Sequence, residues 1–312
     1  MYRNYISLFG FILLLTIGAA CDNNHYSPQD KIFADPNKGL IKDVEFLSSD
    51  SLMGRRTGTE GAKIAREYIV ERFDSLNLKP LNGSYQHPFE NPLSGRIANL
   101  DSSINVAGMI EGTSNPQQYI LLTAHYDHLG NEGELIYNGA DDNASGVAGM
   151  MAAAEHFSRN TPGHSMIFVA FDAEELGLAG AKYFTESPPV DLNQIRLVVN
   201  LDMISVNTKN RLIASGTAHH PFTRPFVEAQ SENSPLDIVL GYDTDEWPQN
   251  WTFASDHGPF HRKGVPYIYF GVEDHEQYHQ PGDTFENIDQ AFFLKAVEFI
   301  IGFLEKTDEN LL

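Results

Sequence analysis

The chain has 312 residues, 42% of them hydrophobic, which is enough for one large domain with a sizeable core. Acidic residues number 42 against 21 basic ones, so the formal net charge is −21. Because a chain this acidic repels phosphate, the composition argues against nucleic acid or an anionic membrane surface as a partner.

Residues 1–20 have the pattern of a signal peptide. Arg3 precedes an apolar run over residues 6–20 that is short for a membrane span and ends in small residues. The only cysteine, Cys21, follows at the expected cleavage position. The segment resembles a bacterial lipoprotein signal, although Gly18 stands where such signals usually carry leucine. The resemblance implies an exported cell-envelope lipoprotein, on the periplasmic or surface side, held to the membrane only by a lipid on Cys21. The alternative is an ordinary secreted protein with an incidental cysteine.

Residues 21–40 are polar and contain two prolines, so we expect a flexible tether there. No repeat and no second linker follows, and residues 41–312 are predicted to form a single domain.

The spacing of apolar residues predicts alternating helices and strands along this domain. In chain order we expect a helix over 59–78, strands over 104–110 and 119–127, a helix over 145–157, a strand over 165–171, a helix over 177–184, a strand over 195–203, a helix near 221–231, a strand over 266–271 and a helix over 291–306. The strands are apolar on both faces. This pattern predicts a three-layer α/β/α sandwich with a central mixed, mostly parallel sheet.

Ionisable side chains follow the strands of this sheet at the points where they end. They are His125, Asp127, Asp172, Glu174, Glu175, Asp202 and His279. Asp142 lies in the loop "GADDNASG", before the buried helix. Because functional groups collect beyond the carboxyl ends of parallel strands, we expect these side chains to meet at one edge of the sheet.

Each of these residues has a simpler explanation when it is taken alone. His125 could be a hydrogen-bonded core histidine, Asp142 or Asn143 could cap a helix, and His279 could be exposed on a loop. Together, two imidazoles and several carboxylates form a ligand set suited to Zn²⁺. Converging carboxylates repel one another unless cations neutralise them, and two ions that share one carboxylate would do so.

Six motifs occur in an order that matches a known family. They are "HYDHLG", "GADDNASG", "DAEELGLAG", "NLDM", "SDHGPF" and "YHQPGDT". The chain from Leu47 onward resembles metallopeptidase family twenty-eight, the zinc exopeptidases best known as bacterial leucyl-type aminopeptidases. The resemblance implies that residues 41–312 form one zinc-peptidase catalytic domain that holds two Zn²⁺ ions.

The resemblance also implies the ligands of the two ions. Asp142 would bridge them, His125 and Asp202 would complete one site, and Glu175 and His279 would complete the other.

Three further residues receive roles by the same resemblance. Glu174 would be the general base, which explains why two glutamates stand side by side: one binds metal and its neighbour moves protons. Asp127 would accept the second ring N–H of His125 and fix its tautomer. Tyr278 could donate a hydrogen bond to the oxyanion, with ordinary loop packing as the alternative. We also expect a cis peptide bond after Asp142.

The implied reaction is hydrolysis of the N-terminal peptide bond of peptides with a free N-terminus, by a metal-bridging hydroxide with a glutamate base. Three alternatives share the fold: a glutaminyl cyclase with one zinc ion, which forms N-terminal pyroglutamate; a non-catalytic binding module; and a carboxypeptidase or dipeptidase. The cyclase interpretation is weakened because all five ligands of a two-metal site are present, and the binding-module interpretation needs missing ligands.

Two other segments receive weaker predictions. Ser255, Asp256 and His257 are expected to support the metal-site loops and to take no part in the chemistry. The rings of the segment 242–253 could line a pocket for the first side chain of the substrate, or they could pack on the surface.

Overall fold

The computed structural model describes residues 36–91, 93, 103–207 and 209–311. The predicted signal peptide, the lipid on Cys21 and the tether up to residue 35 lie outside these residues. Residues 36–40 were also expected in the tether, but they are helical, because helix α1 (Pro36–Leu47) begins there and buries Leu40. Within the described part of the chain, we find no helix with the length and apolar character that a membrane span requires.

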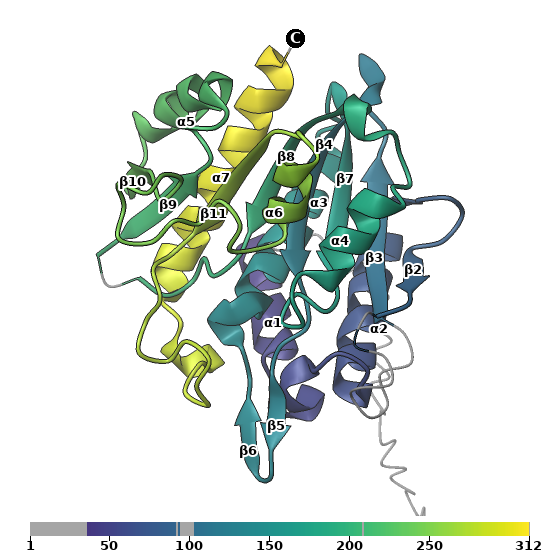
Figure 1. Ribbon diagram of the computed structural model, residues 1–312, viewed down its shortest axis with the longest axis vertical. Coiled ribbons are helices and arrows are strands. Elements are labelled where there is room, and N and C mark those ends of the chain that lie inside the picture. Colours follow the sequence, from purple (N-terminus) through teal and green to yellow (C-terminus); the bar gives the residue numbers. More distant parts are fainter. Residues whose placement is uncertain (1–35, 92, 94–102, 208, 312) are drawn as a thin grey trace, which may run out of the picture.

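The centre of the molecule is a mixed sheet (Figure 1). Its strands, in the order in which they lie side by side, are β1 (Lys79–Pro80), β3 (Ser103–Ile110), β7 (His164–Phe171), β4 (Asn115–His125), β8 (Ile195–Leu201), β11 (Tyr267–Gly271), β9 (Arg211–Ser215) and β10 (Asp237–Leu240), with β2 (Gln86–Phe89) paired to β3. The four central strands β7, β4, β8 and β11 are parallel. Antiparallel pairs join β3 to β7 and β9 to β11.

Helices cover both faces of the sheet (Figure 1). On one face lie α1, α2 (Glu60–Ser75), α3 (Gly146–Arg159) and α7 (Gln290–Asn310), and on the other lie α4 (Ala179–Glu186) and α6 (His257–Arg262). Helix α5 (Arg224–Ser231) packs beside α7. The predicted three-layer sandwich is therefore confirmed.

The side chains of β4 show why helices must cover both faces of the sheet. Ile120 and Leu122 point into the core beneath α3 and α7, while Leu121 points into the core beneath α4 and α6. Successive side chains of a strand point to opposite faces, so a strand that is apolar at every position must be buried on both.

The predicted helices and strands are all present, with ends shifted by a few residues. The sequence analysis missed α1, α6, β1, β2, β9, β10 and the hairpin of β5 (Gly130–Glu132) and β6 (Leu135–Tyr137). Most of these segments are six residues long or shorter. Over so few positions, helical and strand spacing of apolar residues cannot be told apart.

Candidate metal centre

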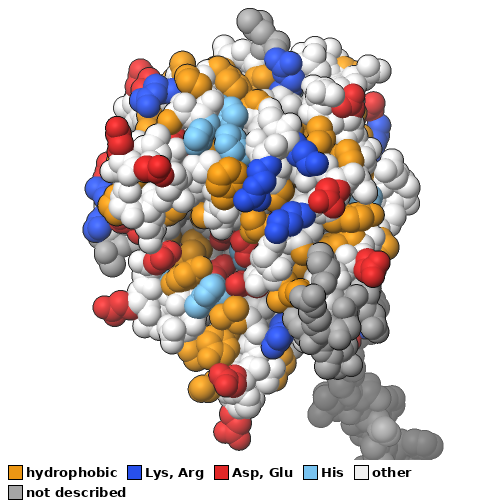
Figure 2. Space-filling model, in the orientation of Figure 1, with side chains coloured by type: hydrophobic (Ala, Val, Ile, Leu, Met, Phe, Trp, Pro, Cys, Tyr) orange, Lys and Arg blue, Asp and Glu red, His pale blue; other side chains and the backbone are white. Residues whose placement is uncertain are grey.

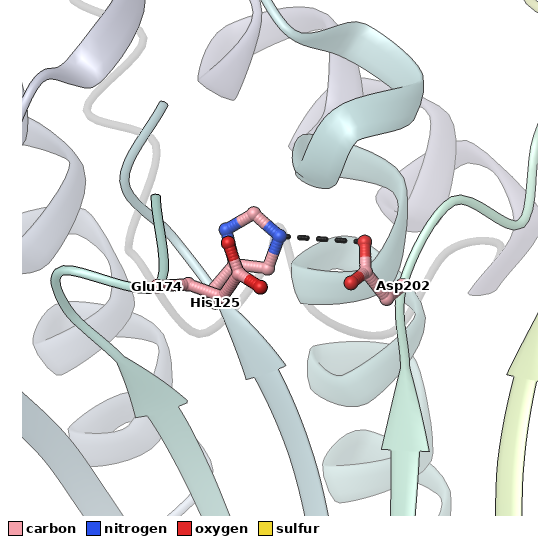
Figure 3. A group of neighbouring side chains, drawn as sticks. All are labelled: His125, Glu174 and Asp202. Carbon is pink, nitrogen blue, oxygen red and sulfur yellow. Dashed lines mark hydrogen bonds and ion pairs between the residues drawn. The ribbon is translucent and has the colours of Figure 1, made fainter. Parts of the chain in front are cut away.

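Three adjacent parallel strands deliver ionisable side chains to one point. His125 is the last residue of β4, Asp202 directly follows β8, and Glu174 lies in the turn after β7. Figure 3 shows the three side chains pointing toward one another beyond the ends of their strands, with His125 Nε2 3.3 Å from Asp202 Oδ1. The expected gathering at the carboxyl edge of the sheet is confirmed.

Asp142 stands between the two predicted metal sites. One of its carboxylate oxygens, Oδ1, is 3.3 Å from His125 Nε2. The other, Oδ2, is 3.1 Å from His279 Nε2. A carboxylate that directs one oxygen to each ligand set has the position required of a bridge. The expected cis peptide bond joins Asp142 to Asn143.

The second ligand set contains one residue more than expected. His279 Nε2 is 3.4 Å from Glu175 Oε2, as the predicted site requires. His128 Nδ1 is 2.8 Å from Glu175 Oε1, and its Nε2 is buried without a hydrogen-bond partner. The motif "HYDHLG" showed this histidine, but it follows the end of β4, where the direction of a side chain cannot be read from the sequence.

All five predicted metal ligands are thus brought together. Among the described residues, two groups have ligand atoms within 4.8 Å of one another: His125 with Glu174 and Asp202, and His128 with Asp142 and Glu175. Imidazole and carboxylate are suitable ligands for Zn²⁺ and related divalent ions. Glu174 lies among the ligand atoms of the first group, close enough to exchange a proton with a water held there.

The buried carboxylates of the centre need cations nearby to stay ionised. Burial raises the pKa of Glu174 well above its usual range, and the carboxylates of Asp202 and Asp256 raise it further, against the effect of His125. Asp256 is fully buried, and neither of its carboxylate oxygens has a hydrogen-bond partner. Several carboxylates in one buried site can all stay ionised only if positive charge lies beside them. The residues present therefore fit a pair of divalent ions.

The predicted role of Asp127 needs a correction. The N–H at Nδ1 of His125 is directed to the backbone carbonyl oxygen of Asp127, 3.1 Å away, while the carboxylate oxygen Oδ1 is 3.7 Å away. The carboxylate instead accepts the backbone N–H groups of Glu174 and Glu175, at 3.0 and 3.3 Å. A carbonyl oxygen fixes the tautomer of the ring, and the carboxylate holds the turn with the two glutamates.

The loop that carries Asp142 is fixed from the far side of the centre. Asp283 accepts the backbone N–H groups of Asp141 and Asp142, at 2.8 and 3.0 Å. Gly139, just before this loop, has a φ of 58°, and a Cβ there would lie 2.1 Å from the carbonyl oxygen of Asp142 and 2.6 Å from the ring of His128. Only glycine allows this close approach.

Arg55 lies buried beneath the centre, and the sequence analysis did not find it. Its guanidinium donates to the backbone carbonyl oxygens of Leu47, Tyr126, Asn138 and Gly139, at 2.5 to 2.9 Å. Burial lowers the pKa of Arg55 to about 10, while nearby carboxylates such as Asp283 oppose this, so the group keeps its charge at neutral pH. Arg55 thereby joins the segment after His125 to the segment before Asp142.

A small pocket of about 80 Å³ opens beside the metal ligands. Figure 2 shows acidic side chains at the bottom of a hollow on the viewed face. The apolar part of the pocket wall consists of Met203, Trp251, Ala254, Tyr269 and Val272.

The aromatic segment 242–253 is divided between the pocket and the surface. Trp251 lines the pocket and packs on Tyr242, which also stacks with Trp247. Phe253 is 47% exposed. Tyr278 lines the pocket as well, and its ring stacks on His279 at 3.9 Å between centroids.

Two of the three residues in "SDH" support the loops around the centre. Ser255 Oγ accepts a hydrogen bond from Asn200 Nδ2, and His257 Nε2 is 2.8 Å from the carbonyl oxygen of Trp251. Asp256 adds a buried carboxyl group close to Glu174, and burial raises its pKa well above its usual range.

Comparison with known proteins agrees with this geometry. The model of Peptidase family M28 matches residues 105–304. The chain belongs to peptidase family M28. Its mixed sheet with helices on both faces is similar to the fold of zinc aminopeptidases of known structure. One of these, BSAP from Bacillus subtilis, superimposes with a TM-score of 0.69 over 86% of this chain and 94% of that chain, at 17% sequence identity. A likeness at this identity shows the fold.

Curated relatives are similar in sequence over much of the chain. A probable zinc metalloprotease of Pyrenophora tritici-repentis is 26% identical over 77% of this chain and 64% of its own length. The aminopeptidase YwaD of Bacillus subtilis is 26% identical over 58% of this chain and 39% of its own length. The chain therefore spans less than two thirds of the length of these relatives.

Proposed function

We propose that this M28 protein is a dinuclear zinc aminopeptidase that hydrolyses the N-terminal peptide bond of peptides. The observation that carries the proposal is the position of Asp142, whose two oxygens face His125 and His279 separately. A site for one metal ion would need no carboxylate in this position. The names of the relatives, a zinc metalloprotease and an aminopeptidase, support the same conclusion.

The ligands divide into two sets. His125 and Asp202 would hold one ion, Glu175 and His279 would hold the other, and Asp142 would contact both. Two ions bound there would lower the pKa of a shared water and polarise the scissile carbonyl group.

The side chains of the protein supply proton transfer and positioning. Glu174 takes the proton from the attacking water and later gives it to the leaving amine. Its carboxylate lies among the ligand atoms of the first group, within reach of a water held there. Tyr278, which lines the pocket, would donate its hydroxyl hydrogen to the oxygen that becomes negative.

The pocket suggests how a substrate is oriented. The apolar wall that includes Met203, Trp251 and Val272 would take the first side chain, which favours an apolar residue of modest size. Asp274, which also lines the pocket, would attract the positive α-amino group. A glutaminyl cyclase remains the second candidate because it shares the fold, but Asp142 between two ligand sets disfavours a single ion.

Substitution Glu174→Gln tests the proposal. The amide keeps the size of the side chain but cannot accept a proton, so we expect the metal content to stay unchanged and kcat/KM on aminoacyl anilides to fall by at least about 10³-fold. Asp191→Asn, at an exposed carboxylate outside the centre, is the control. Activity of the Gln variant within tenfold of the parent would reject Glu174 as the base. One metal ion per chain, with pyroglutamate as the product, would favour the cyclase.

We further propose that the chain is exported and lipidated at Cys21, on the basis of the apolar segment and its position before the cysteine. Expression in a bacterial host with a labelled fatty acid tests this. The parent should carry the label in the membrane fraction, and Cys21→Ser should lose it; an unlabelled parent would contradict lipidation.

A further inference from the structure

The side-chain amide of Gln249 joins two segments beside the catalytic pocket. Its Oε1 accepts the indole N–H of Trp251 at 2.9 Å, and its Nε2 donates to Oδ2 of Asp274 at 3.3 Å. Gln249 and Trp251 belong to the segment before α6, whereas Asp274 lies in the loop after β11. Trp251 and Asp274 both line the pocket, so Gln249 links two of its lining residues.

The two contacts allow only one orientation of this amide. An indole N–H can only donate a hydrogen bond, and an ionised carboxylate can only accept one. The amide must therefore direct its oxygen to Trp251 and its NH₂ group to Asp274. A flipped amide would lose both contacts.

The same two segments are joined at a second place. The hydroxyl of Tyr242 donates to the carboxylate of Glu273, the residue directly before Asp274. The backbone N–H of Trp251 donates to the carbonyl oxygen of Tyr242 at 2.6 Å. The backbone beside Asp274 is thus held against the aromatic segment, and the contact with Gln249 sets the direction of the exposed Asp274 side chain.

Asp274 has a carboxylate oxygen to offer a substrate. Asp142, Glu174 and Asp202 also line the pocket, but they belong to the candidate metal centre. In the described part of the chain, Asp274 makes no hydrogen bond or ion pair other than the one with Gln249, which uses Oδ2. Oδ1 is therefore available to a protonated amine, for which a carboxylate is the strongest hydrogen-bond acceptor.

The electrostatic effect of Asp274 extends into the pocket. Burial raises the pKa of the Tyr278 hydroxyl, and nearby carboxylates, the one of Asp274 among them, raise it further. Tyr278 lines the pocket beside His279. A cation held there would be attracted by the same carboxylate.

We propose that Gln249 is a positioning residue for the α-amino group of the substrate: by holding Oδ2 of Asp274, it keeps Oδ1 directed to the amine of the first residue. The inference rests on the proposed aminopeptidase function, in which Asp274 attracts this amine, and adds the residue that fixes the carboxylate. It also defines the substrate class as peptides with an unmodified, charged N-terminus. An acylated N-terminus would bring a neutral amide to this carboxylate and would bind poorly.

Steady-state kinetics with alanyl anilide test the proposal. Asp274→Asn removes the charge, and Gln249→Glu places a second carboxylate against Asp274, which repels it. Because the amine takes no part in bond cleavage, its contact is the same in the ground and transition states, and its loss raises KM with little change in kcat. We expect KM to rise at least about tenfold in Asp274→Asn and about three- to tenfold in Gln249→Glu, with kcat within about twofold of the parent and the metal content unchanged.

The double variant Gln249→Glu/Asp274→Asn separates positioning from a structural role. In this variant the amide and the carboxylate exchange places, so the contact between the two positions and the acceptor for Trp251 are both kept, while the negative charge leaves position 274. Its melting temperature should equal that of the parent, whereas its KM should stay as high as that of Asp274→Asn. A merely structural role predicts that KM returns to the value of the parent.

Asp245→Asn is the matched control. Asp245 is an exposed carboxylate of the same segment and also accepts from an amide, Nδ2 of Asn250 at 2.8 Å, but it is not among the residues that line the pocket. The control changes the net charge by the same amount as Asp274→Asn and should leave KM within about twofold of the parent.

Inhibition by two simple probes measures the same contact directly. Butylamine and 1-butanol share an apolar chain, but only butylamine carries a positive charge. In Asp274→Asn the inhibition constant of butylamine should rise at least about tenfold, and that of 1-butanol by less than about twofold. The inference is wrong if Asp274→Asn or Gln249→Glu keeps KM within about twofold of an active parent, or if the double variant regains the KM of the parent. A parent that hydrolyses no aminoacyl anilide would instead reject the proposed aminopeptidase function.

Discussion

The carboxylate of Asp127 accepts the backbone N–H of Glu174 at 3.0 Å, across the gap between two neighbouring strands. Its second oxygen accepts the N–H of Glu175 at 3.3 Å and the hydroxyl hydrogen of Thr57 at 3.2 Å. Ala173, just before the two glutamates, has a φ of 59°, a left-handed conformation that costs roughly 1–2 kcal/mol for a residue with a Cβ. Asp127 therefore holds a strained turn from which the carboxylates of Glu174 and Glu175 reach different ligand groups.

Substitution Asp127→Asn should reduce activity without removing metal. The amide has one acceptor oxygen where the carboxylate has two, so one of the two backbone N–H groups loses its partner. Loss of such a supporting contact typically lowers activity about 10–100-fold, and we expect kcat/KM to fall by that amount with the metal content unchanged.

Thr57→Val is the matched control for this substitution. It removes the hydroxyl hydrogen bonds to Asp127 and Asp172 but leaves both backbone N–H groups paired. The loss of activity in Thr57→Val should be clearly smaller than in Asp127→Asn. If Asp127→Asn retained more than half of the activity of the parent, the turn would not depend on the carboxylate.

Replacement of His128 should weaken the binding of one metal ion more than that of the other. Nδ1 of His128 lies 2.8 Å from Glu175 Oε1 and 3.7 Å from Oδ2 of Asp142, the oxygen that faces His279. In His128→Gln we expect the ion of the Glu175 site to be lost at about 10–100-fold lower chelator concentration than in the parent, because a contact that orients or supplies a ligand is gone. Chelator competition followed by metal analysis should then show a stable intermediate with one ion.

His87→Gln, at a half-buried histidine of β2 near the edge of the sheet, is the control for His128. It should release both ions as the parent does. Release of both ions from His128→Gln at the chelator concentration of the parent would show that His128 contributes nothing to the centre.

The sequence was sufficient to predict that the candidate ligands gather, because each stands at a strand end or in a short motif. The strands around His125 and Asp202 have clear apolar spacing, and parallel strands must bring their carboxyl ends to the same edge. The pair Glu174 and Glu175 was informative because neither local helix nor strand spacing calls for two adjacent carboxylates there.

The supporting residues could not be predicted because their partners are distant in the chain. Arg55 donates to the carbonyl oxygens of Tyr126 and Gly139, 71 and 84 residues further on. Backbone carbonyl groups carry no sequence signal, so an arginine that binds only to them looks like any other arginine. The same holds for Asp127, whose backbone carbonyl oxygen lies nearer to Nδ1 of His125 than its carboxylate does.

Removal of the Arg55 guanidinium should destabilise the whole domain. Arg55→Met would remove the guanidinium donor from four buried carbonyl oxygens, of which Gly139 keeps the N–H of Ala144, and each oxygen left without a donor costs about 1–3 kcal/mol. We expect the free energy of unfolding in urea, measured with a chelator present, to fall by at least about 3 kcal/mol.

Two variants control for this effect. Arg55→Lys keeps the charge but cannot reach all four carbonyl oxygens, so its stability should lie between those of the parent and Arg55→Met. Arg56→Met removes the neighbouring exposed arginine and should change stability by no more than about 0.5 kcal/mol. Equal stability of Arg55→Met and the parent would contradict the structural role.

His220 should make the protein less stable in acid. Burial lowers its pKa from 6.5 to about 4, with His261 and His219 adding to the effect, so between these pH values the unfolded chain binds a proton that the folded chain does not. Stability is therefore lost as the pH falls through this window. With a chelator present, the drop in melting temperature from pH 7 to pH 5 should be smaller in His220→Gln than in the parent or in the control His156→Gln. A drop as large as that of the parent would show that this ring does not titrate on unfolding.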